Sequence, residues 1–347
     1  MKSSRNWSAE YSALETRVLA ALRADLREAE FDALALEVHA FQKRWNEPYG
    51  KFCASKPEPK SWREIPAVPQ SAFKSHRLSV APPDAIGKTF RTSGTTGEGF
   101  GEHHFANTRL YDAAVVAGWQ RLDLPRDAWP VILAPRPENA PHSSLAHMLG
   151  ALAGDGFFLL EKDGSVNIGR FIAATQTCFH AKRPIALLGT ALAFLNVFER
   201  LGSARPQRRA KSFAMETGGY KGSGRDIPKA ELYAKFGGHL DIAPDRVLNE
   251  YGMTELSSQF YTRGLGGAHE SGPWLRALVI DPETGREAAA GEAGVLRIFD
   301  LANLGSVLAI ETQDIAIRRG RGFELIGRDP GAIPRGCSRA ADERMRA

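Results

Sequence analysis

Four short apolar runs in the middle of the chain constrain its fold more than any other feature. They are PVILAP (130–135), GFFLLE (156–161), RPIALLGT (183–190) and DRVLNEYG (245–252), and stretches with helical spacing alternate with them. Apolar runs of this length are typical of buried strands, and their alternation with helices is typical of a sheet covered by helices. The sequence therefore predicts an α/β fold.

The two ends of the chain have other patterns. From residue 8 to 45 apolar residues recur at helical intervals among charges, which predicts two amphipathic helices. Residues 56–73 carry four prolines and predict an extended connection. Residues 276–301 alternate apolar and polar side chains around Asp281–Gly285, which predicts a β-hairpin.

Composition excludes several classes of protein. The chain has 347 residues with a net charge of +5, and its basic residues are spread among 40 acidic ones, so the arginine-rich end (318–347) is typical of a solvated tail rather than a nucleic-acid-binding arm. Its three cysteines have no zinc-type spacing. No run approaches the ~18 apolar residues of a membrane span, and the charged N-terminus does not resemble a signal peptide. We expect a cytoplasmic protein with reduced thiols.

The segment RTSGTTGEGFG (91–101) consists almost entirely of glycine and hydroxyl residues up to Phe100. Two interpretations are open: a surface linker, or a loop whose backbone N–H groups and hydroxyls bind phosphate oxygens. It is not a Walker A loop, because Lys-Ser or Lys-Thr does not follow its last glycine. The upstream PPDAIGKTF (82–90) ends like a Walker A motif but has Pro82 where the first glycine is required.

Four further segments carry candidate site residues. ETGGYKG (216–222) follows a predicted strand and offers a glycine pair, and NEYGMTEL (249–256) places an aromatic, a hydroxyl and a carboxylate after another strand. ETQDIA (311–316) sets Asp314 at an expected strand end. IGRDPGAIPRGCS (326–338) contains Arg328 and Cys337.

The order of these motifs resembles the adenylate-forming superfamily of acyl- and aryl-CoA ligases, peptide-synthetase adenylation domains and luciferases. Within it, the chain most resembles the acyl-protein synthetases (the LuxE family), through FQKRWNEPYGKFC, IPAVPQSAFKS, FRTSGTTG, SSLAHML, ETGGYKG, NEYGMTELSSQFY and GRDPGAIPRGCS. These motifs run from Phe41 to Ser338 and so cover nearly the whole chain. The resemblance implies an adenylation domain over 1–326, with a helical part at 1–75, and a hinge and short tail at 327–347.

The resemblance also implies ATP and Mg²⁺ as cofactors and a role for each motif residue. Glu255 would bind Mg²⁺, which prefers carboxylate and phosphate oxygens; a glutamate at a helix N-terminus is the alternative interpretation. Thr254 would contact the α-phosphate, and Asp314 would accept hydrogen bonds from both ribose hydroxyls with Arg328 as a nearby donor. Tyr251 would stack on adenine, although an aromatic at this place is otherwise a core residue. The phosphates would bind Ser93, Gly94, Thr95, Thr96 and Gly97, and the second adenine wall would be Gly218, Gly219 and Tyr220.

The implied reaction activates a carboxylic acid, in this family a fatty acid, as an acyl-adenylate that a thiol then attacks. Cys337 is the implied acceptor, since Arg335 and Arg339 would favour its thiolate; a tail thiol without a role is the alternative. Cys53 and Cys178 are expected to be packed. We expect the small C-terminal domain and lysine of the wider superfamily to be absent, with Lys221 or Arg328 as a candidate substitute for the lysine. The acyl group would pass to a protein partner, a reductase or a carrier.

The sequence leaves two other functions open. One is a ligase that delivers the acyl group to CoA or to a carrier-protein phosphopantetheine, with Cys337 idle. The other is a non-catalytic nucleotide-binding protein. His103 and His104 follow the glycine-rich loop and are expected either to line the site or to lie on the surface; His142 and His147 flank SSLAHML and have no assigned role.

Overall fold

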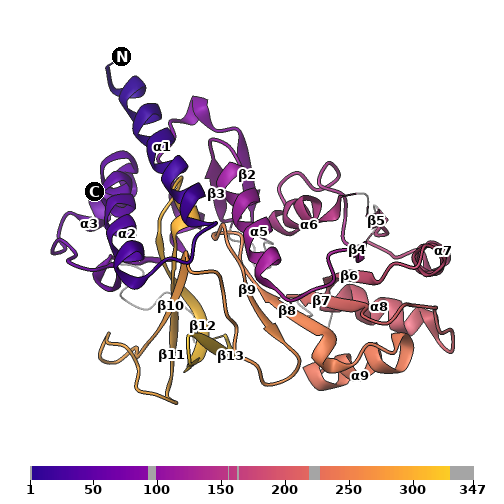
Figure 1. Cartoon of the computed structure of the whole chain (residues 1–347). Helices are drawn as coiled ribbons and strands as arrows, with labels where there is room; N and C mark the ends of the chain where they lie inside the picture. The colour runs from indigo at the N-terminus through magenta and orange to yellow at the C-terminus, as the bar shows by residue number, and fades with distance from the viewer. Residues whose placement is uncertain (1, 93–98, 155, 162–163, 219–226, 329–347) are drawn as a thin grey trace. The chain divides into compact units, whose positions relative to one another are not determined.

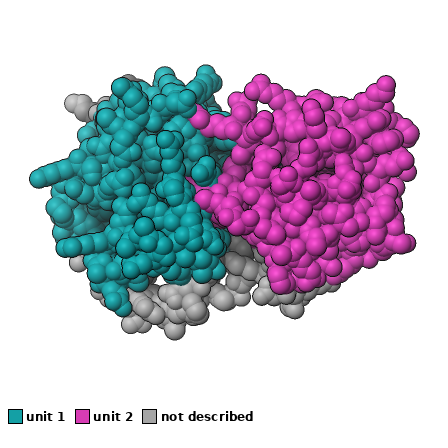
Figure 2. Space-filling view, turned by 60° about the horizontal axis from the view of Figure 1, so that its bottom comes forward, with its two compact units in different colours: residues 1–119, 253–259, 270–347 teal, residues 120–252, 260–269 magenta. Residues whose placement is uncertain are grey.

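The computed structural model describes residues 2–92, 99–154, 156–161, 164–218 and 227–328 (Figure 1). The chain forms two compact units, which are coloured separately in Figure 2. Unit 1 comprises Met1–Trp119, Met253–Gln259 and Glu270–Ala347, and unit 2 comprises Gln120–Gly252 and Phe260–His269. The described residues contain no helix long and apolar enough to cross a membrane.

Unit 1 begins with the two helices that the sequence predicts. The second of them, α2, is capped at its N-terminus by Glu30, whose carboxylate accepts a hydrogen bond from the backbone N–H of Arg27 at 2.9 Å. Its buried face includes Phe31, which meets the edge of Trp62 at a ring-centroid distance of 5.4 Å. The helices are α1 (Lys2–Ala21), α2 (Glu28–Trp45), α3 (Glu47–Cys53), α4 (Ala72–Ser75) and α5 (Arg109–Arg121), with 3-10 turns at Trp62–Glu64, Pro83–Ala85 and Leu301–Asn303.

The main sheet of unit 1 joins segments far apart in the sequence. Its order is β1-β12-β11-β10, with β13 also paired to β12, and only the short β1 runs parallel to its neighbour. Within the proline-rich connection Val68 pairs with Ile310, so this segment is a sheet edge and not merely a linker. The strands are β1 (Val68–Pro69), β10 (Leu275–Ile280), β11 (Ala293–Asp300), β12 (Ala309–Arg319) and β13 (Gly322–Arg328).

The predicted hairpin is β10 and β11, which are antiparallel with Ile280 opposite Val295. The turn lies where the sequence places it, because the N–H of Asp281 donates to the carbonyl of Arg286 at 2.8 Å. After the turn the chain first makes an isolated bridge from Glu287 to Ile280 and reaches β11 only at Ala293. The connection is therefore longer than the sequence suggested.

Unit 2 is built on the predicted α/β sheet, whose strand order is β5-β4-β6-β7-β8-β9. The first five strands are parallel and β9 is antiparallel to β8. The predicted apolar runs form β4 (Trp129–Leu133), β5 (Phe157–Phe158), β6 (Ile185–Thr190) and β8 (Val247–Tyr251), and the other strands are β7 (Phe213–Thr217) and β9 (Phe260–Arg263).

Helices pack on this sheet through one hydrophobic cluster that includes Leu187, Phe194, Phe198 and Phe236. The side-chain oxygens of Asn167 and Thr190 cap the N-termini of α7 and α8. These caps fix the residue at which each helix begins. The helices are α6 (Ser144–Ala153), α7 (Ile168–His180), α8 (Ala191–Leu201) and α9 (Lys229–Leu240), with a 3-10 turn at Pro244–Arg246.

Candidate functional site

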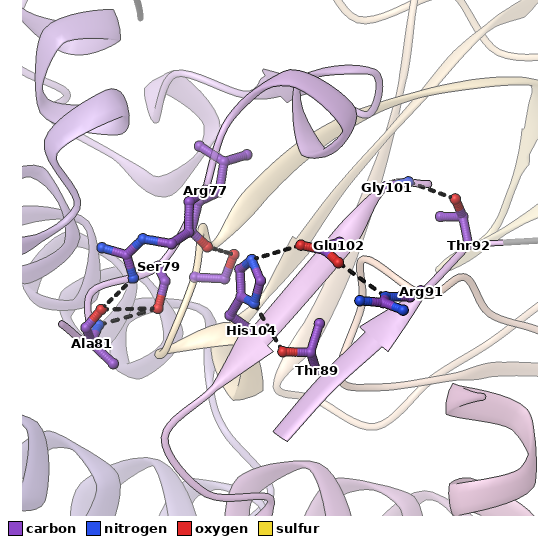
Figure 3. A network of polar contacts seen from close by, with 11 residues as sticks. Arg77, Ser79, Ala81, Thr89, Arg91, Thr92, Gly101, Glu102 and His104 are labelled. Atoms are coloured by element: carbon purple, nitrogen blue, oxygen red, sulfur yellow. Dashed lines mark hydrogen bonds and ion pairs between the residues drawn. The ribbon is translucent and has the colours of Figure 1, made fainter. Parts of the chain in front are cut away.

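The glycine-rich segment is the connection of a β-hairpin. Strands β2 (Lys88–Arg91) and β3 (Glu102–Phe105) are antiparallel, and beyond them the N–H of Thr92 donates to the carbonyl of Gly101 at 2.9 Å. The N–H of Gly101 in turn donates to the Thr92 hydroxyl at 2.9 Å (Figure 3). The two ends of the loop are thus held together by backbone and hydroxyl groups. The predicted phosphate-binding residues Ser93, Gly94, Thr95, Thr96 and Gly97 lie outside the described residues.

Polar side chains reinforce this hairpin across its two strands. Arg91 Nε donates to Glu102 Oε1 at 2.9 Å, and His104 lies between Glu102 and Thr89 (Figure 3). Burial is the main cause that lowers the pKa of His104. The stem that carries the glycine-rich loop is therefore fixed by side chains as well as by the strand ladder.

Thr254 and Glu255 belong to a segment without regular secondary structure that three side chains hold. Gln70 Nε2 donates to Glu255 Oε1 at 3.1 Å, and Asn303 Nδ2 donates to the Glu255 carbonyl at 2.8 Å. His103 Nδ1 lies 2.9 Å from the Thr254 carbonyl. Glu255 is buried, with 3% of the residue exposed. No helix begins here, so the interpretation of Glu255 as a helix N-terminal residue is wrong.

A buried carboxylate, that of Asp300, holds the same segment at Ser257 and Ser258. Asp300, at the end of β11, accepts hydrogen bonds from the Ser257 N–H at 2.9 Å, the Ser258 hydroxyl at 2.8 Å and the Ala302 N–H at 3.0 Å. Burial raises the pKa of Asp300 to about 6, against the lowering effect of these donors. We call residues 253–258 the anchored segment. Sequence reasoning missed Asp300, Gln70 and Asn303 as its supports.

His103 is a core residue, so of the two sequence interpretations a surface position is wrong. The residue is 1% exposed, and its ring contacts that of Phe105, at a centroid distance of 4.0 Å, and that of Phe73, at 5.7 Å. Burial lowers the pKa of His103 to about 3, so the ring is neutral at physiological pH. Because its Nδ1 faces the carbonyl of Thr254, that nitrogen carries the proton and donates it.

Asp314 lies inside β12 and not at a strand end, which corrects the sequence prediction. The strand continues to Arg319, and Asp314 occupies an irregular stretch, because Val295 pairs with Ile315 whereas Arg297 pairs with Glu311. The Thr312 hydroxyl stabilises the irregularity by accepting from the Asp314 N–H at 3.1 Å. Bulges of this kind re-aim side chains beside functional sites. On the other edge Asp314 pairs with the backbone of Arg328, whose side chain lies outside the described part.

In unit 2, two predicted adenine-binding residues lie at the carboxyl ends of adjacent parallel strands. Gly218 directly follows β7 and has a φ of +68°, a conformation that favours glycine. Tyr251 ends β8 with 8% of its surface exposed, and meets Phe260 at 6.2 Å and His269 at 5.9 Å between ring centroids. The other two predicted residues, Gly219 and Tyr220, lie outside the described residues.

A buried polar cluster that sequence reasoning missed lies at these same strand ends. Asn249 is its centre: its Nδ2 donates to Glu216 Oε1 at 2.9 Å, and its Oδ1 accepts from Lys229 Nζ at 2.9 Å and lies 2.8 Å from His269 Nε2. Tyr233 also donates to Glu216, at 3.1 Å.

Beside it the Thr217 hydroxyl donates to Glu250. Burial raises the pKa of Glu216, and it raises that of Glu250 to about 7 with a smaller contribution from the neighbouring Glu216 charge. Both glutamates lie within strands whose residues are all buried, and a charged residue type inside such a strand was the available sequence signal.

The predicted packing of two cysteines is confirmed. Cys53 and Cys178 are buried, and burial raises the pKa of the Cys53 thiol to about 11 and also raises that of Cys178. Cys337 lies outside the described residues. Among the residues that the structure describes, no group of three or more His, Cys, Asp or Glu side chains could hold a metal ion, so a metal held by Glu255 would need ligands from substrate or water.

In unit 1, the structure thus brings Thr254 and Glu255 together with the side chains that hold their segment, which are Gln70, His103 and Asp300. Asp314 also belongs to unit 1 and lies in β12. Gly218 and Tyr251 lie together at one sheet edge of unit 2.

Known proteins identify the class of fold. No family model matches the chain. The ATP-bound structure of MatB from Rhodopseudomonas palustris aligns with 72% of this chain at 17% identity and a TM-score of 0.51. A 2-hydroxyisobutyryl-CoA ligase in complex with 2-HIB-AMP and CoA aligns with 88% at 16% identity and a TM-score of 0.64. The chain has the α/β fold of adenylate-forming enzymes, and it spans 49% of the MatB chain and 71% of the other.

A curated relative points to a particular type within this class. The long-chain-fatty-acid–luciferin-component ligase of Aliivibrio fischeri is 22% identical over 307 residues, which are 82% of this chain and 78% of the relative. This similarity confirms the resemblance to acyl-protein synthetases that the motifs indicated.

Proposed function

We propose that this protein uses ATP to convert a carboxylic acid into an acyl-adenylate and passes the acyl group to a thiol. The observation that carries the proposal is the anchored segment. A buried glutamate and a threonine, without regular secondary structure around them, are fixed by hydrogen bonds from Gln70, His103 and Asn303. Such preorganisation is what a site needs when it must position charged groups rather than react covalently.

In the proposed reaction a carboxylate oxygen of the acid attacks the α-phosphorus of ATP and pyrophosphate leaves. Thr254 would contact the α-phosphate, and the Asp314 carboxylate would accept from the ribose hydroxyls with Arg328 nearby. Glu255 would hold Mg²⁺, which would supply charge neutralisation on the phosphate oxygens. Adenine would lie between Tyr251 on one side and Gly218, Gly219 and Tyr220 on the other. The β- and γ-phosphates would be bound by Ser93, Gly94, Thr95, Thr96 and Gly97.

The acyl acceptor that we propose is Cys337. Thiolates, not thiols, are the nucleophiles, and burial raises the pKa values of Cys53 and Cys178. These two cysteines are therefore poor acceptors. The resulting thioester would be handed to a protein partner such as a reductase or a carrier. The similarity to a long-chain-fatty-acid–luciferin-component ligase favours a fatty acid as the substrate.

The adenylation step is tested by a screen of carboxylic acids for ATP–pyrophosphate exchange, which reports adenylation whatever the acceptor. With the acid so identified, Glu255→Gln should lower exchange by ~10²-fold or more, because the amide keeps the shape but loses the charge that the metal requires. Glu283→Gln, a change in the exposed turn before β11, is the matched control and should exchange normally. Exchange at the wild-type rate in Glu255→Gln would refute the role of Glu255.

The acceptor is tested with labelled acid and Mg·ATP. Label should stay on the denatured protein and be released by neutral hydroxylamine, as a thioester is. Cys337→Ser should abolish the label and leave pyrophosphate exchange near normal, since adenylation needs no thiol. Cys53→Ser and Cys178→Ser should retain it. If the wild-type protein adenylates its acid but only added CoA or a holo carrier protein becomes acylated, the acceptor is external and Cys337 has no such role.

A further inference from the structure

A cavity lies at the edge of the unit 2 sheet that is opposite to Gly218 and Tyr251. Because β4, β6, β7 and β8 are parallel, the residues just before each strand share one edge of the sheet. Lys211 precedes β7, Arg246 precedes β8, and Arg263, at the end of β9, pairs with Leu248 near the start of β8. Together they line a cavity of about 440 Å³, with Phe213 on its wall and Asp123 and Asp127 also lining it. We call this cavity the amino-edge pocket.

The three cations of the pocket come from different elements, and two of them donate hydrogen bonds to backbone carbonyls. Arg246 Nη1 donates to the carbonyl of Ser212 at 3.2 Å, and Arg263 Nη2 donates to that of Asp123 at 3.1 Å. Within the described ranges, Lys211, Arg246 and Arg263 form no ion pair with a carboxylate. A guanidinium has five N–H donors, so each arginine is positioned by one and retains others for a ligand.

The backbone at Lys211 is strained in a way that points to a role for this residue. Its φ is +71°, in the left-handed region where residues with a Cβ are uncommon. The next residue fixes this turn, because the Ser212 hydroxyl donates to the carbonyl of Arg209 at 2.7 Å and accepts from the N–H of Ile185 at 3.0 Å. Strain of this kind clusters at ligand-binding positions.

We propose that the amino-edge pocket binds a phosphate ester that also carries hydroxyl groups. A phosphate monoester brings nearly two negative charges and three acceptor oxygens to three cations, whereas a carboxylate brings one charge. Asp123 and Asp127 are acceptors only, so they suit the hydroxyl donors of the same ligand. The cavity volume falls in the range of small-molecule sites, ~300–1,000 Å³. None of these residues belongs to the proposed adenylation site, so the two proposals stand or fall separately.

Isothermal titration with glycerol 3-phosphate and with inorganic phosphate tests the proposal on the full chain. Lys211→Gly removes the cation and relieves the left-handed strain, so this variant keeps its fold. Lys211→Gly and Arg263→Gln should each weaken glycerol 3-phosphate binding by ~10-fold or more, since each removes a charge-assisted hydrogen bond. The matched control is Arg170→Gln at the start of α7, which removes the same charge outside the pocket and should bind like the wild type.

A second comparison distinguishes recognition of the phosphate group from recognition of the hydroxyl groups of the ligand. The wild type should bind glycerol 3-phosphate more tightly than inorganic phosphate, and Asp127→Asn should reduce that difference by weakening only the ester. The proposal is overturned if neither probe binds, if Lys211→Gly binds both probes like the wild type, or if an oligoglutamate peptide binds through these cations while the phosphates do not.

Discussion

At the scale of single residues, His103 links two motifs that are far apart in the sequence. It lies in β3, shortly after the glycine-rich segment, and its Nδ1–H donates to the carbonyl of Thr254 at 2.9 Å. The ring is buried and neutral, so it acts as a fixed donor and not as an acid or base. His103 is therefore a positioning residue for the anchored segment.

Two variants of His103 should behave differently. The Nδ2 of His103→Asn can occupy the place of the histidine Nδ1, so pyrophosphate exchange should stay within several-fold of the wild type. His103→Leu fills the space without a donor and leaves a buried carbonyl unpaired, at a cost of ~1–3 kcal/mol, so kcat for exchange should fall by ~10-fold or more.

The check is the contrast between the two variants. It is measured as kcat and KM for ATP, with thermal stability measured alongside. Equal losses of kcat in both variants, in proportion to lost stability, would show that His103 matters only for packing. Because the pKa of His103 is about 3, its replacement by Asn should leave the pH profile of exchange between pH 5 and 8 unchanged.

The residues that sequence reasoning missed share a physical cause. Gln70, Asp300 and Asn303 act on the anchored segment from positions 42 or more residues away, at ranges that no local pattern reports. By contrast, the packing of Cys53 and Cys178 could be predicted, because burial of a thiol follows from the apolar periodicity of its own helix. Roles assigned to Ser93–Gly97, Arg328 and Cys337 stay predictions.

At the scale of elements, the sequence predicted the strands that are apolar and missed those that are not. The runs that became β4, β6 and β8 are buried along most of their length, so their composition reports their structure. Strands β2 and β3 read KTFR and EHHF, in which polar residues dominate, and no periodicity marks them. The end of β12 was misplaced because the polar pair Gln313–Asp314 resembles a strand end, whereas the Thr312 hydroxyl lets the strand continue through it.

At the scale of the whole molecule, buried carboxyls in both units set how stability depends on pH. Burial raises the pKa of Glu250 to about 7 from an ordinary 4.5, and that of Asp300 to about 6 from 3.8. A carboxyl whose pKa is higher in the folded than in the unfolded state stabilises the fold most at a pH below its unfolded-state pKa. This contribution to the free energy of unfolding is lost as the pH rises through the folded-state pKa. For Glu250 the loss falls between about pH 4.5 and 7.

Glu250→Gln should remove the contribution of Glu250 to this pH dependence and leave that of Asp300. The amide stays neutral and can still accept from Thr217, so the variant should gain up to about 3 kcal/mol relative to the wild type on going from pH 5 to pH 8. Urea denaturation at the two pH values measures the difference, with the exposed Glu138→Gln as control. A wild type that is equally stable at both values, or a variant with an undiminished slope, would contradict the raised pKa of Glu250.

The pairing of Val68 with Ile310 has a consequence for the order in which a ribosome can finish this protein. Unit 2 is nearly continuous in sequence, from Gln120 to His269, and can complete its sheet while synthesis proceeds. The first hundred or so residues cannot do the same, because their contacts are with residues translated much later. Gln42 donates a hydrogen bond to the carbonyl of Asn303, and the ring of Trp62 packs against that of Phe299. The last part of unit 1 to be translated is therefore what buries the first, and for most of the translation time the nascent N-terminal helices expose apolar faces that a chaperone would recognise.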